Sequence, residues 1–283
     1  MVALEEEGRA GWAVVAGAAA WAVGLMVGAT GCSGGGAAAE SARAGDDSVE
    51  VLHQAAATLQ RAGSAKARTS MEMATGGTRV TIRGEGVYDF KDQMGRLKVL
   101  LPEDPAGTDE HRPITELLAP GALFMKNRGA GVPADKWVRV DTAGLSDGNL
   151  VTGGATDPYA AAELLRGART ATYVGKTEVA GTPVRHYRGT ADLDVAAGSA
   201  SKGQRSALKA AAKGFATAEV PFDAYLDDEG RLRKVRHRFS FVNGQRKGTV
   251  AVASTTLLYD FGVPADVRLP ESGDIFAGKI AEQ

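Results

Sequence analysis

Alternation of apolar and polar residues with a period of two is the feature that most restricts the fold of this 283-residue chain. Residues 79–90 place small or apolar residues at every second position and charged or polar residues mostly between them. The first set is Val80, Ile82, Gly84, Gly86, Tyr88 and Phe90, and the second is Arg79, Thr81, Arg83, Glu85 and Asp89. Since successive side chains of a strand point to opposite faces, the pattern predicts an antiparallel strand with one face buried.

Similar patterns recur along the rest of the chain. After a turn at residues 91–95, Leu97, Val99 and Leu101 return on one face, as expected of a hairpin partner. Further strands are predicted at residues 122–127, 136–141, 171–179, 182–192, 219–226, 231–242 and 249–261. Asp227-Asp228-Glu229-Gly230 has the composition of a hairpin loop between two of them.

A few helices are expected between the strands. Ser48 begins one, in which apolar residues recur at three and four positions until Gly63. Others are predicted at residues 114–118, at 157–166, where Asp157 caps a helix that starts with Pro158, and at 201–215. The sum is an α+β fold with one long antiparallel sheet and helices on a single face.

The N-terminal segment has a different character. Residues 10–31 carry no charge, and Ala29, Thr30 and Gly31 precede Cys32, the only cysteine of the chain. This order resembles the lipobox of bacterial lipoproteins, in which the cysteine is acylated. It predicts a signal peptide over residues 1–31, lipidation, for example with palmitate, at Cys32, and anchorage to the outer face of the cell membrane. The alternative is a retained anchor, since about 20 apolar residues can span a bilayer.

Residues 33–47 are small and polar and cannot form a core. They predict a flexible tether over residues 32–47, followed by one folded domain over 48–283. The net charge of −1 offers no basic excess for nucleic acid. The spacing of His, Cys, Asp and Glu predicts no metal site, and no cofactor motif is present.

The inward face of the predicted sheet has an unusual pair of residues. Gly84 and Gly86 occupy successive inward positions, where glycine gives up packing. Either another element approaches closely there, or the glycines form a trough for a ligand. The candidate cavity residues are Ile82, Gly84, Gly86, Tyr88, Leu97, Val99, Leu123, Met125, Phe222, Phe239 and Phe241. The alternative for the apolar ones is plain core.

Four stretches resemble the LppX/LprG family of actinobacterial cell-envelope lipoproteins, whose fold is similar to that of LolA and LolB. They are GEGVYD at 84–89, KWVRV at 136–140, VRHY at 184–187 and VPFDAYLDDEGRL at 220–232, and they follow Cys32 in the family's order. The resemblance implies a curved half-barrel sheet closed by helices on its concave face. It also implies an apolar cavity for the acyl chains of an envelope lipid, and carriage rather than catalysis.

Two other functions compete with lipid carriage. One is a cell-surface interaction or sensing module with a closed core and a protein partner. The other is a serine esterase, because Gly144-Leu145-Ser146-Asp147-Gly148 fits G-x-S-x-G, and Asp192 or Asp194 and then His237 follow. The residues after Gly148 have a loop composition, whereas a nucleophile elbow needs a helix there, so a solvated loop is favoured.

A basic stripe is predicted on the helix over residues 201–215. Lys202, Arg205, Lys209 and Lys213 recur at three and four positions and would share one helix face. Such a stripe is either an ordinary solvated face or a surface for anionic lipid headgroups. Lys234, Arg236 and Arg238 alternate on a later strand and would extend this surface.

Overall fold

The computed structural model describes residues 47–75, 78–102, 112–129, 131–151, 153, 155–242 and 249–278. Within these residues, eleven strands form one antiparallel sheet in the order β6-β5-β4-β3-β2-β1-β11-β10-β9-β8-β7. The strands are β1 Ser64–Thr75, β2 Thr78–Asp89, β3 Met94–Leu100, β4 Ile114–Ala119, β5 Ala122–Lys126, β6 Trp137–Asp141, β7 Ala168–Val179, β8 Thr182–Asp192, β9 Glu219–Leu226, β10 Leu232–Val242 and β11 Thr249–Tyr259. Two meanders therefore meet where β11 pairs with β1.

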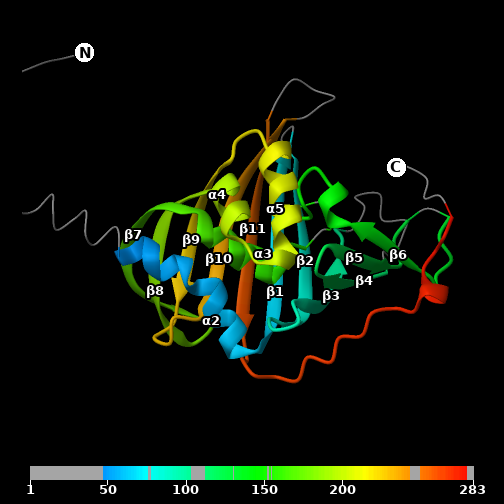
Figure 1. Cartoon of the computed structure of the whole chain (residues 1–283), viewed down its shortest axis with the longest axis horizontal. Coiled ribbons are helices and arrows are strands. Elements are labelled where there is room, and N and C mark those ends of the chain that lie inside the picture. The colour runs from blue at the N-terminus through cyan, green and yellow to red at the C-terminus, as the bar shows by residue number, and fades with distance from the viewer. Residues whose placement is uncertain are drawn as a thin grey trace, which may run out of the picture.

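The helices lie together on one face of this curved sheet (Figure 1). They are a helix over residues 47–53, α2 Ala55–Ala62, α3 Pro158–Glu163, α4 Leu193–Ser199 and α5 Lys202–Gly214, with short 3-10 turns η1 Thr142–Gly144 and η2 Leu164–Gly167. A third 3-10 turn, η3 Ser272–Asp274, lies apart from them beside β6. The Asp157 carboxylate accepts hydrogen bonds from the N–H groups of Tyr159 and Ala160 at 2.7 and 3.1 Å, so it caps α3. The predicted α+β half-barrel is confirmed. We call the helix-covered face of the sheet the inner face.

An aromatic cluster joins the sheet to the helices. The rings of Tyr88, Phe90 and Tyr159 have centroids 5.2 to 6.5 Å apart, and all three side chains are fully buried. The Tyr88 hydroxyl donates to Asp157 Oδ2 at 3.2 Å, and Gln204 Nε2 of α5 donates to the same oxygen at 3.3 Å. One carboxylate thus connects β2, α3 and α5, and burial raises the pKa of the Tyr88 hydroxyl.

The helix predicted at residues 114–118 is wrong, because these residues form β4. Its inner face packs Ile114 and Leu118 in the main core, and its outer face packs Leu117 and Ala119 against a second cluster that contains Val267. A strand buried on both faces loses the alternation of polar and apolar residues. A short apolar run of this kind cannot be distinguished from a buried helix by periodicity.

One strand and one α-helix had no counterpart in the sequence prediction. β1 has three alanines, two methionines, Lys66, Arg68 and Glu72 among its residues, all of which favour helices, but it pairs with β2 on one side and β11 on the other. Tertiary pairing therefore overrides its local preference. The short helix α4 is capped by Asp192, whose carboxylate accepts a hydrogen bond from the Val195 N–H at 2.9 Å.

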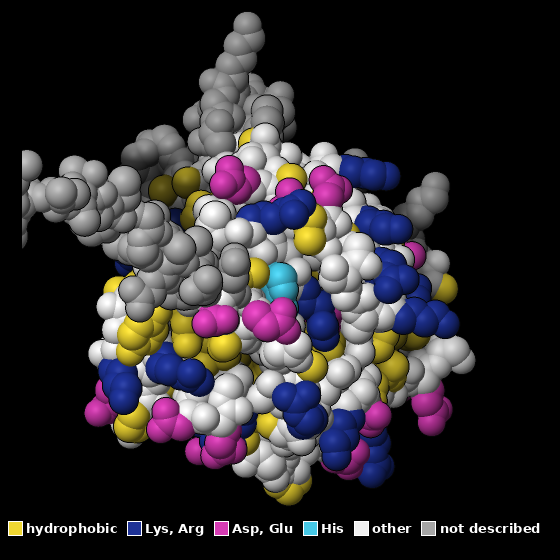
Figure 2. All heavy atoms as spheres, turned by 60° about the vertical axis from the view of Figure 1, so that its left-hand side comes forward, with side chains coloured by type: hydrophobic (Ala, Val, Ile, Leu, Met, Phe, Trp, Pro, Cys, Tyr) yellow, Lys and Arg dark blue, Asp and Glu magenta, His cyan; other side chains and the backbone are white. Residues whose placement is uncertain are grey.

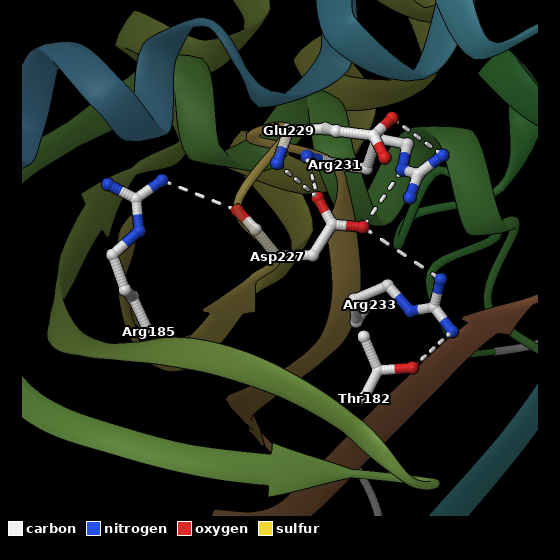
Figure 3. A network of polar contacts seen from close by, with 6 residues as sticks. All are labelled: Thr182, Arg185, Asp227, Glu229, Arg231 and Arg233. Carbon is white, nitrogen blue, oxygen red and sulfur yellow. Dashed lines mark hydrogen bonds and ion pairs between the residues drawn. The ribbon is translucent and has the colours of Figure 1, made fainter.

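The predicted hairpin loop after β9 is confirmed, and Asp227 organises it (Figure 3). Its Oδ1 accepts hydrogen bonds from the N–H groups of Glu229 and Arg231 at 3.1 and 2.9 Å. Its Oδ2 pairs with the Arg231 guanidinium at 2.8 Å, and Arg185 donates to the Asp227 carbonyl at 3.3 Å. These contacts hold the end of β9 and the start of β10 in a defined geometry.

Candidate functional site

The inner face carries every residue predicted for the cavity. One continuous apolar cluster contains Ile82, Tyr88, Leu97, Val99, Leu123, Met125, Phe222 and Phe239, with Phe241 packed against it. Gly84 and Gly86 lie between Ile82 and Tyr88 on β2. The short helices and the segment around Ala155 cover this layer, because Ala155 and the α5 residues Leu208 and Ala211 belong to the same cluster.

At both glycines, other parts of the protein closely approach the backbone of β2. An ideal Cβ atom at Gly84 would lie 2.6 Å from Thr69 Oγ1 and 3.3 Å from Ala155 Cβ. At Gly86 it would strike the carbonyl oxygen of Arg96 in β3. Of the two alternatives for the glycine pair, a close approach of other protein segments therefore fits this structure. Protein atoms fill the space beside both glycines.

The inner face also holds polar groups that the sequence pattern did not bring together. Thr69 lies opposite Thr256, and His237 lies opposite Ser254, whose hydroxyl bonds to that of Thr156. Thr69 Oγ1, Thr256 Oγ1 and His237 Nε2 are buried and have no hydrogen-bond partner among the described residues. Burial lowers the pKa of His237 to about 3, so its ring is neutral at neutral pH.

Glu116 is a further polar group on this face, and sequence reasoning missed it. It lies in register with Leu97 of β3 and Met125 of β5 and is 0% exposed. Neither carboxyl oxygen has a hydrogen-bond partner in the described part of the chain. Burial raises its pKa to about 8, against the opposing effect of Arg128. The sequence signal for this site was a charged residue, Glu116, within the apolar run 114–119. Because this run was assigned to a helix, the sequence did not place Glu116 on the inner face of the sheet.

The esterase constellation is not assembled in the described residues. Ser146 is exposed in a turn after η1, and irregular chain rather than a helix follows it. The neighbouring Asp147 carboxylate accepts backbone hydrogen bonds from Asn149 and Val151. His237 Nε2 has no hydrogen-bond partner within the described part of the chain, and Asp192 caps α4. The described residues also contain no group of three His, Cys, Asp or Glu side chains placed to hold a metal ion.

The basic stripe on α5 exists as a surface. Lys202, Arg205, Lys209 and Lys213 are all exposed, while Gln204, Ala207, Leu208 and Ala211 of the same helix are buried. None of the four cations forms an ion pair with another described residue. Because its other face packs on the core, α5 presents this stripe away from the sheet.

The predicted extension of the stripe by β10 is wrong. Lys234, Arg236 and Arg238 alternate with Val235 and Phe239 of the inner cluster, so they lie on the outer face. Arg236 pairs there with Glu72 at 3.3 Å and Arg238 with Asp223 at 2.8 Å. The side of the molecule shown in Figure 2 likewise mixes acidic and basic side chains.

Among the hollows that described residues line, two have inner-face residues in their walls, Thr69 and Gly84 in one and Ile114 in the other. One of about 480 Å³ lies on the outer face of β11, β1, β2 and β3 and is lined by Arg68, Ser70, Arg83, Glu85, Lys98, Leu100, Thr255 and Leu257, among others. Another of about 300 Å³ lies where β4 begins and β5 ends, and its walls include Ile114, Arg128 and Val132. Ile114 is an inner-face residue, so the second hollow borders the interior.

The N-terminal predictions lie outside the described residues, which begin at residue 47. The signal peptide, Cys32 and most of the tether are therefore not seen. In the part of the chain that is described, no helix is long and apolar enough to cross a membrane.

No family model and no curated protein matches the chain. Solved structures similar to it include LppX of Mycobacterium tuberculosis, at 9% identity and a TM-score of 0.44, covering 79% of this chain and 99% of that one. LprF from Mycobacterium bovis is similar at 12% identity and a TM-score of 0.40, covering 80% and 97%. A putative outer membrane lipoprotein-sorting domain from Vibrio parahaemolyticus has 11% identity, a TM-score of 0.30, and coverage of 81% and 96%. The similarity to LppX that the sequence predicted is thus found.

Proposed function

We propose that this protein is an exported lipoprotein, anchored through Cys32, that binds the acyl chains of an envelope lipid and carries or presents it. The observation that carries the proposal is the inner face. Its apolar layer runs across the sheet from Val138 of β6 to Tyr187 of β8, and short helices cover it. Such a layer is suited to hold alkyl chains, each methylene of which gains about 0.8 kcal/mol on burial.

Ligand entry requires the covering segments to move apart from the sheet. Hydrophobic burial is non-directional, so alkyl chains can replace the side chains that now cover Ile82 and Val99. The long strands supply a rigid frame. The helices α2, α3 and α4 are short, with 8, 6 and 7 residues, so they are the segments that we expect to move. We therefore place the bound chains between the helices and the inner face, and the function is binding rather than catalysis.

The proposal is tested by what the protein carries when it is isolated from its own cell envelope. Native mass spectrometry should show a mass increment that disappears after solvent extraction, and the extract should contain an acyl lipid. The stripped protein should then bind a fluorescent fatty-acyl probe. A protein that carries nothing and binds no probe would contradict the proposal and favour a closed interaction module.

Anchorage has its own test at the cysteine. Cys32→Ala removes the only thiol, so the protein should leave the membrane fraction or accumulate as an uncleaved precursor. Fractionation and intact mass measure this, with Ser41→Ala in the tether as the control that stays anchored. An unmodified Cys32 within an uncleaved parent chain would instead indicate a retained transmembrane anchor.

The basic stripe on α5 gives the carrier a membrane-facing side in this proposal. Lys202, Arg205, Lys209 and Lys213 point away from the sheet, on a helix that covers the inner face. Each cation near an anionic surface contributes about 1 kcal/mol. Docking through this stripe would bring the helices that cover the proposed ligand toward the headgroups, where the lipid must enter or leave.

A further inference from the structure

The buried carboxyl of Glu116 has a position that points to a ligand contact. On the inner face it is bordered by Leu97 and Met125 across the sheet and by Ile114 and Leu118 along β4. All four neighbours are apolar and belong to the main core. Both carboxyl oxygens are inaccessible, and neither has a partner among the described residues.

An unpaired carboxyl at this place is costly for folding. Leaving a buried polar group without a hydrogen bond costs about 1–3 kcal/mol, and an ionised one costs more. Leucine or methionine would fill the same space without this cost, as Leu97 and Met125 do on either side. The residue is therefore of no use to the core, and its hydrogen-bonding capacity is available to something that enters the interior.

A second unpaired group lies in the same part of the interior. Asn149 Oδ1 is buried and has no partner in the described structure. An ideal Cβ atom at Gly153 would lie 2.4 Å from Asn149 Oδ1 and 3.2 Å from Leu123 Cδ2, so both side chains flank this glycine. Leu123 is the inner-face residue two positions before Met125 on β5. Glu116 on β4 can thus donate a hydrogen bond as a carboxylic acid, and Asn149 in the turn that packs near Leu123 can accept one through its amide oxygen.

The region borders a hollow. Ile114, two residues before Glu116 on the same face of β4, lines the hollow of about 300 Å³ where β4 begins and β5 ends. Two residues along a strand span about 7 Å, a distance that a lipid linkage region bridges easily. A ligand that entered there would meet Glu116 next.

The charge around Glu116 limits the ligand class. Arg128 is the charged group that acts on it, and Arg128 is half-exposed at the wall of the hollow, which the exposed Arg112 also lines. A free phosphate or carboxylate buried beside Glu116 would find no buried cation there among the described residues, because Arg112 and Arg128 lie at the wall of the hollow and are exposed or half-exposed. A neutral ligand group with an ester carbonyl and a hydroxyl would satisfy both protein groups. The ester carbonyl would accept a hydrogen bond from the Glu116 acid, and the hydroxyl would donate one to the Asn149 amide oxygen.

We propose that the Glu116 carboxylic acid donates a hydrogen bond to an ester carbonyl of the bound lipid, so that the interior selects a neutral glycerolipid of the diacylglycerol type. This specificity rests on the proposed function of lipid binding. The acyl chains contact the apolar inner face, and Glu116 recognises the linkage between them. The ester is favoured over a plain hydrocarbon because only the ester satisfies the buried acid.

The test compares two probes on the parent protein, two Glu116 variants and one control variant. Dipalmitoylglycerol carries esters and a hydroxyl, whereas hexadecane carries neither, and each competes with a fluorescent apolar probe. Glu116→Leu should bind dipalmitoylglycerol about tenfold more weakly, since it loses a hydrogen bond to a buried group, and should bind hexadecane at least as tightly as the parent. Glu116→Gln keeps a donor and should stay close to the parent for both probes.

Met125→Leu is the matched control, because it changes the adjacent inner-face residue without removing a polar group. It should affect both probes alike. Equal dipalmitoylglycerol affinity in the folded Glu116→Leu variant and the parent would overturn the proposal, as would a parallel loss of both probes. If the parent binds neither probe, lipid binding itself fails, which is a distinguishable result.

A spectroscopic measurement keeps the proposal testable if Glu116→Leu does not fold. Infrared difference spectra on adding dipalmitoylglycerol should show a shifted protonated-carboxyl band in the parent. This band should be missing in Glu116→Gln, which has no carboxyl at that position. An unshifted band in a parent that binds the lipid would overturn the proposal.

Discussion

Gly86→Ala is expected to destabilise the domain by more than about 3 kcal/mol and to leave little folded protein. The added Cβ atom would meet the carbonyl oxygen of Arg96 in β3 and would lie 2.9 Å from the Arg96 carbonyl carbon and 3.0 Å from Leu97 Cα. These are backbone atoms of the adjacent strand, so no side-chain rotation relieves the clash. β2 and β3 must separate, which breaks their ladder.

Two other glycines provide matched controls in urea unfolding. At Gly84 the nearest atom is the Thr69 hydroxyl, which can rotate, so Gly84→Ala should cost less than Gly86→Ala. Gly198 in α4 is exposed and has open space around its Cβ position, so Gly198→Ala should be neutral or slightly stabilising. A Gly86→Ala protein as stable as the parent would show that β3 can move. Larger side chains at Gly86 would report on folding and not on ligand binding.

Glu116 and His237 are expected to give the stability of the domain two opposing dependences on pH. The pKa of Glu116 is raised to about 8 in the folded protein, from about 4.3 when unfolded. Its contribution to stability is fully present below the unfolded value and is lost as pH rises through about 8. At about 1.4 kcal/mol per pH unit, the loss is on the order of 5 kcal/mol.

His237 acts in the other direction. Its pKa is lowered to about 3 in the folded protein, from about 6.5 when unfolded. Its contribution is complete above the unfolded value and is lost as pH falls toward about 3. In the parent the two slopes oppose each other from about pH 4.3 to 6.5, and the Glu116 slope remains alone from there to about pH 8.

Single variants separate the two slopes in urea unfolding measured from pH 4 to 8.5. Relative to the parent, Glu116→Gln should gain stability progressively as pH rises toward about 8, because its neutral amide does not ionise. His237→Leu should gain stability progressively as pH falls below about 6.5. If both variants reproduce the parent's pH profile, the two groups titrate alike in the folded and unfolded protein and are not desolvated as described.

Local chemistry was sufficient to predict the elements whose faces differ in polarity. β2 has one buried and one solvated face, so its period of two is visible in the residues themselves. The start of α3 follows from the Asp157 cap and Pro158, and the boundaries of α5 follow from its apolar positions and basic stripe. The lipidation prediction at Cys32 likewise needs only the residues around it.

Only the tertiary structure decided which residues lie beside one another on the inner face. β4 is buried on both sides, so its residues carry no period, and β1 has a helical composition that strand pairing overrides. The isolation of Glu116 follows from its pairing with Leu97 of the preceding strand and Met125 of the following one. The register of the strands decides which residues become cross-strand neighbours. Register depends on how the whole sheet packs, so it cannot be read from any local stretch of the sequence.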